Sequence, residues 1–205
     1  MSSLIRAELY RMATIRSSWV SLALFGAVAA AAGVWDKSWW VLFAGIGAFG
    51  ISVLTVTQHY QHRTIALLYV ARPRRFQVLL AQVVTTMLVA EMLAVFSGLP
   101  VWFRWSHQTY TQTLFVIPVM AAFGAGLAAT VRRSAWLLSG FGVWFVIVEG
   151  IAGGLKWPLP MTSYLNASRS DGLGGDAFAL EIFVFWAVTS LAVAAVALRR
   201  DLTGD

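Results

Sequence analysis

The chain contains no cysteine and few charged residues. The lack of cysteine excludes disulfide bonds, thiol redox chemistry and metal sites built on thiolates. Charged residues make up only 12% of the 205 positions, whereas soluble domains carry about 25%. Hydrophobic residues make up 59%, and many of them fall in long uninterrupted runs. Runs of about 18 apolar residues or more can cross a bilayer, so the composition predicts an integral membrane protein.

The sequence also lacks the motifs of nucleotide binding and catalysis. It has no GxxxxGK[ST] phosphate-binding loop, no HExxH motif and no Ser/His/Asp set, so we expect no enzymatic activity in this chain. Gly45, Gly47 and Gly50 match the letters of the dinucleotide fingerprint, but that fingerprint requires a preceding strand and these glycines lie inside an apolar run. They are expected to permit close helix packing instead, as are Gly150 and Gly154.

What the chain does contain is six apolar runs. They comprise residues 18–35, 39–57, 76–103, 113–130, 135–154 and 178–198. Each is long enough for a hydrocarbon core of about 30 Å. Lipid offers the backbone no hydrogen-bond partners, so each run is expected to be helical. The sequence therefore predicts an all-α integral membrane protein in which residues 1–205 form one transmembrane domain.

The basic residues are distributed unevenly between the two sides of these spans. Eleven of the 15 lie on one side and four on the other. The eleven are Arg6, Arg11, Arg16, Arg63, Arg72, Arg74, Arg75, Arg132, Arg133, Arg199 and Arg200, and the four are Lys37, Arg104, Lys156 and Arg169. Cytoplasmic loops carry the excess of Lys and Arg, so both termini are predicted to be cytoplasmic. The net charge of +6 thus follows membrane topology, and no nucleic-acid partner is expected.

Two segments outside the spans carry further patterns. Residues 2–17 place apolar side chains at helical spacing between arginines, which predicts an amphipathic interfacial helix; a charged N-terminal tail is the alternative. The outer connection, 156–177, is either a loop or a short re-entrant helix pair before the sixth span. The apolar stretch 151–159 favours the re-entrant form.

The segment from Gln58 to Arg75 contains two His and four Arg between two apolar runs. An apolar block, 65–70, lies between its basic residues. This pattern is typical of a helix lying along the membrane surface, with its arginines toward phosphates or a cytoplasmic partner. His59 and His62 have helical spacing, but no nearby acid or cysteine completes a metal shell, so no metal site is predicted.

Two carboxylates are candidates for a translocation path or a subunit interface. Glu91 lies near the middle of the third predicted span, where a charge costs about 2.5–3.5 kcal/mol, so it should face protein or water. Alternatively, Glu91 is protonated and bonded to a neighbouring helix, with Thr85 and Thr86 close by. Glu149 lies near the outer end of the fifth span, where an interfacial carboxylate is ordinary.

Three features of the chain together resemble a known family. The first feature is Arg6-Ala-Glu8-Leu-Tyr10-Arg11 followed by Thr14-Ile-Arg16-Ser-Ser-Trp19. The second is His59-Tyr60-Gln61-His62-Arg63-Thr64, followed by Ala71-Arg72-Pro73-Arg74-Arg75 and then Gln82. The third is the re-entrant-like segment before the last span. The chain resembles the permease subunits of the ABC type-2 class of transporters in their small, single-domain bacterial form. Family members often show Glu-Tyr-Arg-His-Gly-Thr and then a Pro-Arg-Arg cluster; this chain departs from that pattern at His59, Gln61, Arg63 and Gln82.

The resemblance implies that a cytoplasmic coupling helix between the second and third spans docks on a separate ABC ATP-binding subunit. The residues that would couple to this ATPase are Tyr60, His62, Arg63, Thr64, Arg74 and Arg75. The resemblance further implies a location in the bacterial inner membrane and a dimer with a second permease copy or a homologous permease. It also implies that the ATP-binding partner binds ATP and Mg²⁺ and that this chain binds no cofactor. Export of an amphipathic or peptide-like substrate is the implied direction.

Two other functions are compatible with the sequence. One is a non-transporting membrane partner, such as a sensor or assembly subunit, which would bind a partner without moving a substrate. The other is an intramembrane enzyme acting on a lipid or peptide, for which Glu91 and Glu149 provide the motivation.

Overall fold

The computed structural model describes residues 2–61, 75–168 and 178–200, and no strand occurs in these ranges. The elements are α1 (Ser2–Thr14), α2 (Arg16–Trp35), α3 (Lys37–Gln61), α5 (Arg75–Ser97), α6 (Leu99–Arg104), α7 (His107–Val131), α8 (Ser134–Val143), the π-helix η1 (Trp144–Ala152), α9 (Pro160–Ser168) and α10 (Ala179–Arg200). The predicted all-helical fold is confirmed for this part of the chain.

Within the described ranges, six helical segments are long and apolar enough to cross a membrane. They are Arg16–Trp35, Lys37–His59, Phe76–Ser97, His107–Val131, Ser134–Ala152 and Ala179–Leu198. These six correspond in order to the six predicted spans, so the chain is a multi-pass membrane protein.

The third predicted span is shorter than expected because the helix breaks at Gly98. We expected it to continue to residue 103, but α5 ends at Ser97 and α6 begins at Leu99. Pro100 has no N–H to donate to a carbonyl one turn earlier, which favours a break here. A Cβ on Gly98 would lie 2.4 Å from the ring of Trp40 and 2.6 Å from that of Tyr110, so only glycine fits between these rings.

The fourth span begins earlier than expected, at His107 instead of residue 113. The Ser106 side chain accepts a hydrogen bond from the Thr109 N–H at 3.2 Å and so caps the first turn of α7. That first turn is polar, and a criterion based on apolar runs therefore excluded it.

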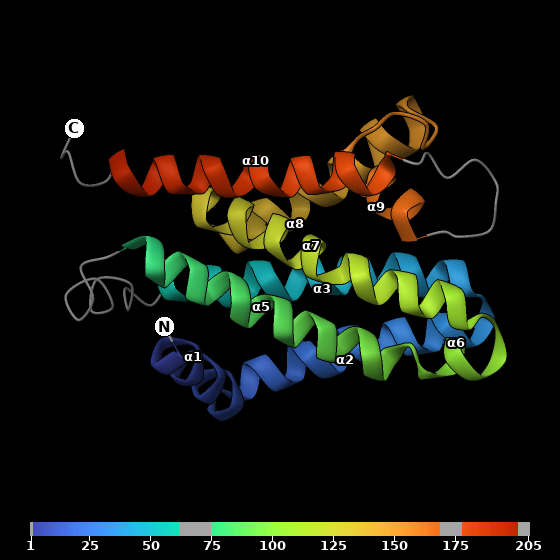
Figure 1. The fold of residues 1–205 in the computed structure, drawn as a ribbon, viewed down its shortest axis with the longest axis horizontal. Coiled ribbons are helices and arrows are strands. Elements are labelled where there is room, and N and C mark those ends of the chain that lie inside the picture. Colours follow the sequence, from blue (N-terminus) through green and yellow to red (C-terminus); the bar gives the residue numbers. More distant parts are fainter. Residues whose placement is uncertain (1, 62–74, 169–177, 201–205) are drawn as a thin grey trace.

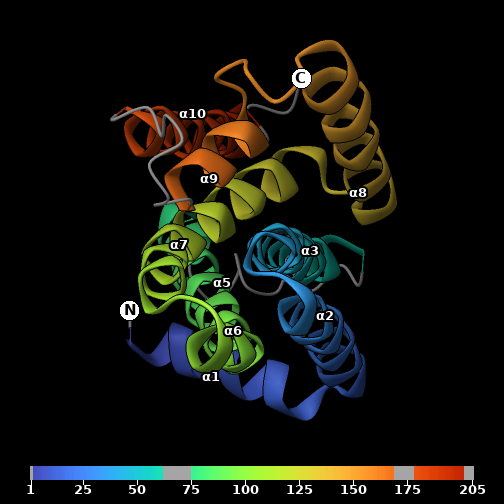
Figure 2. The same cartoon turned by 90° about the vertical axis from the view of Figure 1, so that its right-hand side faces the viewer.

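Helix α7 lies at the centre of the bundle, packed against α3, α5 and α10 (Figure 2). Both termini lie at one end of the molecule, as an even number of spans requires (Figure 1). The spans are buried unequally. In the 18-residue apolar window of the second span 78% of the residues are buried inside the protein, against 17% in that of the first span and 11% in that of the fifth. Most residues of the first and fifth spans are therefore at least partly exposed to the surroundings.

The glycines of the fingerprint-like motif lie at close helix contacts, as predicted. A Cβ on Gly45 would lie 2.4 Å from the ring of Tyr164, and one on Gly50 would lie 2.7 Å from the ring of Phe25. Gly150 and Gly154 behave differently. A Cβ on Gly150 would meet only a carbonyl oxygen of its own helix at 3.4 Å, and one on Gly154 would meet nothing within 4 Å in the described part of the chain.

Helix α1 lies crosswise to the spans at one end of the bundle (Figure 2). Its Leu9 and Met12 pack against a small core cluster of Ile51, Val89 and Leu93. The apolar stripe that was expected to contact lipid thus covers α3 and α5 at these two positions.

Candidate functional site

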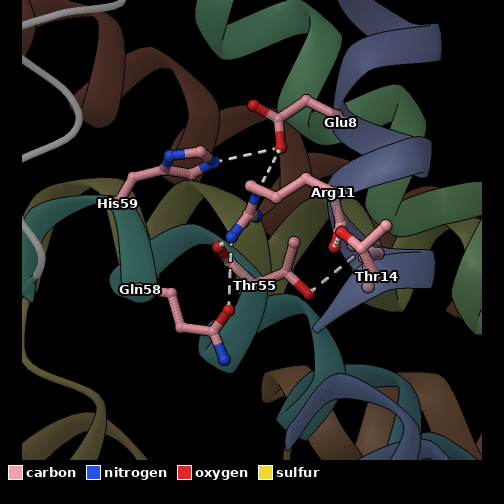
Figure 3. Close-up of polar contacts among 7 residues, drawn as sticks. Glu8, Arg11, Thr14, Thr55, Gln58 and His59 are labelled. Carbon is pink, nitrogen blue, oxygen red and sulfur yellow. Dashed lines mark hydrogen bonds and ion pairs between the residues drawn. The ribbon is translucent and has the colours of Figure 1, made fainter. Parts of the chain in front are cut away.

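A buried contact between a carboxylate and an imidazole connects α1 to the last turn of α3. The Nε2 atom of His59 lies 3.0 Å from Oε2 of Glu8, and the same oxygen accepts a hydrogen bond from Nε of Arg11 at 3.1 Å (Figure 3). Glu8 is 6% exposed and His59 is 3% exposed. Two groups far apart in the sequence therefore share a site from which water is largely excluded.

Arg11 extends this contact to a second turn of α3. Its Nη1 donates to Oε1 of Gln58 at 3.3 Å, and its Nη2 donates to the carbonyl oxygen of Thr55 at 3.5 Å (Figure 3). Together Glu8 and Arg11 bind α1 to Thr55, Gln58 and His59. We call these five residues the α1–α3 link.

The electrostatic state of Glu8 follows from two opposing effects. Burial by itself raises the pKa of the Glu8 carboxyl. The hydrogen bond and charge of His59, and then the charge and hydrogen bond of Arg11, outweigh burial and lower this pKa below its ordinary value of 4.5. Glu8 is therefore a carboxylate at neutral pH, and removing either partner would leave part of its buried charge uncompensated.

The link lies directly before the segment predicted to contact an ATPase. Tyr60 lies in the last turn of α3 and Arg75 is the first residue of α5. His62, Arg63, Thr64 and Arg74 lie outside the described residues, as does the predicted coupling helix itself, and so do the side chains of Tyr60 and Arg75.

Glu149 is fully buried in η1, so the expectation of an ordinary interfacial carboxylate is wrong. Its Oε1 accepts a hydrogen bond from the Met161 N–H at 3.2 Å. Its Oε2 accepts from the Thr162 N–H at 2.6 Å and from the Thr162 hydroxyl at 2.8 Å. Glu149 thus caps the first turn of α9, where unpaired N–H groups favour a negative charge.

Glu91 lies in α5 and is partly exposed. Its Oε2 is buried and has no hydrogen-bond partner among the described residues. The threonines expected nearby do not donate a hydrogen bond to this oxygen. The Thr86 hydroxyl donates to the Val83 carbonyl of its own helix at 2.8 Å. The Thr85 hydroxyl is itself without a partner in the described part. Glu91 and Glu149 therefore occupy different environments, and only Glu149 is fully satisfied.

Sequence reasoning missed Glu8, Arg11, Thr55 and Gln58 as members of a site. The available signal was the position of Glu8, the one acidic residue in the basic stretch 2–17, next to Leu9 on the apolar side. A lone acid on the buried side of a basic helix indicates a cationic partner elsewhere in the chain.

No protein-family model and no curated protein matches the chain. The resemblance to ABC type-2 permeases thus stays a prediction that depends on the residues quoted above.

Proposed function

We propose that this chain is the membrane-spanning permease subunit of an ATP-driven ABC transporter in the bacterial inner membrane. It pairs with a separate ATP-binding subunit and with a second permease copy or a homologous permease, and it exports an amphipathic or peptide-like substrate. Six helices able to span a membrane and a sequence without a phosphate-binding loop support this assignment.

The α1–α3 link is the observation that carries the proposal. A permease driven by another polypeptide must transmit movement from a cytoplasmic contact to its spans. Residues 62–74 directly follow α3, whose last two turns are bound to α1 by Glu8 and Arg11. Helix α1 also packs against α2 and α5. A displacement of residues 62–74 would therefore reach the first three spans together, as a nucleotide-dependent change between two states of the transporter requires.

The exposed fifth span leaves a surface for a partner within the membrane. Only 11% of its 18-residue apolar window is buried within one chain. On the fifth span, Trp136 is 71% exposed and Ile151 is 76% exposed. Lipid or a second permease copy covers such a surface in a membrane.

The decisive experiment is capture of a P-loop ATPase encoded beside this gene, using the purified full chain. We expect capture to fall at least tenfold when Arg63, Arg74 and Arg75 are all changed to Ala. The control is Arg104→Ala, which removes a charge from the predicted outer side and should leave capture unchanged.

Retained capture after replacement of residues 62–74 by a Gly/Ser linker would contradict the proposed coupling segment. ATPase capture without substrate movement in sealed vesicles would instead favour a non-transporting membrane partner.

A further inference from the structure

A cavity of about 200 Å³ lies where α1, α2, α3 and α5 meet. Its walls are largely apolar, with Leu9 and Met12 of α1 facing Leu22 of α2. One part of the lining is polar and includes Thr55 and Gln58, the two residues of α3 that accept hydrogen bonds from Arg11. The cavity therefore has a polar side next to the α1–α3 link and an apolar body.

An open groove of about 410 Å³ continues from this cavity along α2 and α5. The two share Trp19, Leu22 and Met92 in their linings, so they adjoin each other, and we call them together the elbow groove. Along α2 the groove runs from Trp19 to Ala30. At 1.5 Å per residue this is about 16 Å. Since the hydrocarbon core is about 30 Å thick, the groove has the length of one leaflet.

The end of the elbow groove near α1 is positively charged. Arg11 donates to the lining residues Thr55 and Gln58. Arg16 comes two residues before Ser18 of the lining, and Arg6 comes three residues before Leu9 of the lining. Glu8 is the acidic residue among these three arginines, which leaves an excess of two positive charges apart from His59. Arg6 and Arg16 are exposed and form no ion pair within the described residues. Arg16 opens α2, whose first turn has no side-chain cap in the described part, so its N–H groups add to the positive potential.

We propose that the elbow groove binds one acyl chain of an anionic phospholipid, with the phosphate near Arg6 and Arg16. An apolar channel of one leaflet's length with a basic end matches an anionic amphiphile in both length and charge. A second copy of this chain would bring the same arginines to the same surface, and like charges would oppose that contact. The site does not depend on the proposed transport function, because it would bind lipid whether or not the chain couples to an ATPase.

The acyl-chain half of the proposal is tested by filling the groove. Gly26 lines the groove, and a Cβ on it would meet nothing within 4 Å among the described residues, so Gly26→Phe starts a bulky side chain from an open position in the groove. Gly140→Phe is the matched control, because Gly140 is equally open and lies on α8. We expect native mass spectrometry to show one retained phosphatidylglycerol per wild-type chain, an at least tenfold loss in Gly26→Phe and no loss in Gly140→Phe.

The headgroup half is tested by charge. Arg16→Gln should weaken phosphatidylglycerol binding about fivefold and leave binding of phosphatidylcholine with the same chains unchanged. Arg133→Gln, which removes an exposed charge at the start of α8, is the control and should behave as wild type.

A photoactivatable phosphatidylglycerol should label Trp19, Leu22 or Met92. Three results would overturn the proposal. They are equal retention of both lipids by the wild type, unchanged lipid binding in Gly26→Phe, and a crosslink from these residues to a second copy of the chain.

Discussion

His59, which pairs with Glu8 of α1, is a position where this chain departs from the permease pattern that it resembles. That pattern has a Glu where this chain has His59. Here the carboxylate comes from α1 instead, and His59 lies 3.0 Å from it. A departure that looked like a lost residue in the sequence thus corresponds to a formed contact in the structure.

Acid should weaken this contact. The pKa of Glu8 is lower in the folded protein than its ordinary value of 4.5 in the unfolded chain. The Glu8 carboxylate therefore stabilises the fold above pH 4.5, and this stabilisation is lost as the pH falls through the folded-state pKa. We expect the melting temperature of the purified protein to fall more steeply below pH 4.5 in the wild type than in Glu8→Gln. At neutral pH, Glu8→Gln should already be destabilised by roughly 3 kcal/mol.

Glu181→Gln is the control for this measurement, because Glu181 is an exposed carboxylate in the first turn of α10. It should retain the wild-type pH dependence. An identical acid profile in the wild type and in Glu8→Gln would show that Glu8 does not stabilise the link.

At the scale of elements, Glu149 joins η1 to α9. The end of the fifth span and the short helix before the sixth are held together by three hydrogen bonds to this one side chain. Helix α9 is in turn attached to the second span, because the Tyr164 hydroxyl donates to the Val41 carbonyl at 2.8 Å and its ring occupies the space left by Gly45. Glu149 therefore orients a buried helix that contacts three other elements.

Replacing Glu149 by Ala should destabilise the protein by about 3 kcal/mol or more. Two N–H groups of α9 would lose their acceptor, and hydrogen bonds to charged groups contribute roughly 1.5–3 kcal/mol each. Thermal unfolding in detergent measures this effect. Thr162→Val removes only the hydroxyl bond and should cost less, and Glu181→Ala should change stability by about 0.5 kcal/mol at most. If Glu149→Ala unfolded at the wild-type temperature, the capping role would be refuted.

At the scale of the whole molecule, both termini lie at one end (Figure 1), and the excess of basic residues predicts that this end is cytoplasmic. The absence of cysteine makes the orientation directly measurable, because an introduced cysteine is the only thiol in the chain. Lys156→Cys lies on the predicted outer side and Arg133→Cys on the predicted inner side, and both positions are exposed.

A membrane-impermeant maleimide should label Lys156→Cys in intact spheroplasts and label Arg133→Cys only after the membrane is permeabilised. The cysteine-free wild type provides the background. The opposite labelling pattern would reverse the proposed topology and place the α1–α3 link outside the cell.

The spans, their order and the packing role of Gly45 and Gly50 could be predicted from the sequence alone. Lipid requires each spanning segment to satisfy its own backbone, so a long apolar run determines a helix by local composition. The break at Gly98 was missed, although Leu99-Pro100 provided a local signal. Hydropathy averages over a run and does not register a single missing N–H.

Only the tertiary structure decided which polar groups meet. Glu8 and His59 are 51 residues apart in the sequence, and Glu149 reaches Thr162 across the end of the fifth span. Such pairs depend on how each helix is rotated and how deeply it packs, which is set by the whole bundle and not by any one segment. The sequence by itself determined a six-span helical membrane protein, and helix packing determined where its buried charges found partners.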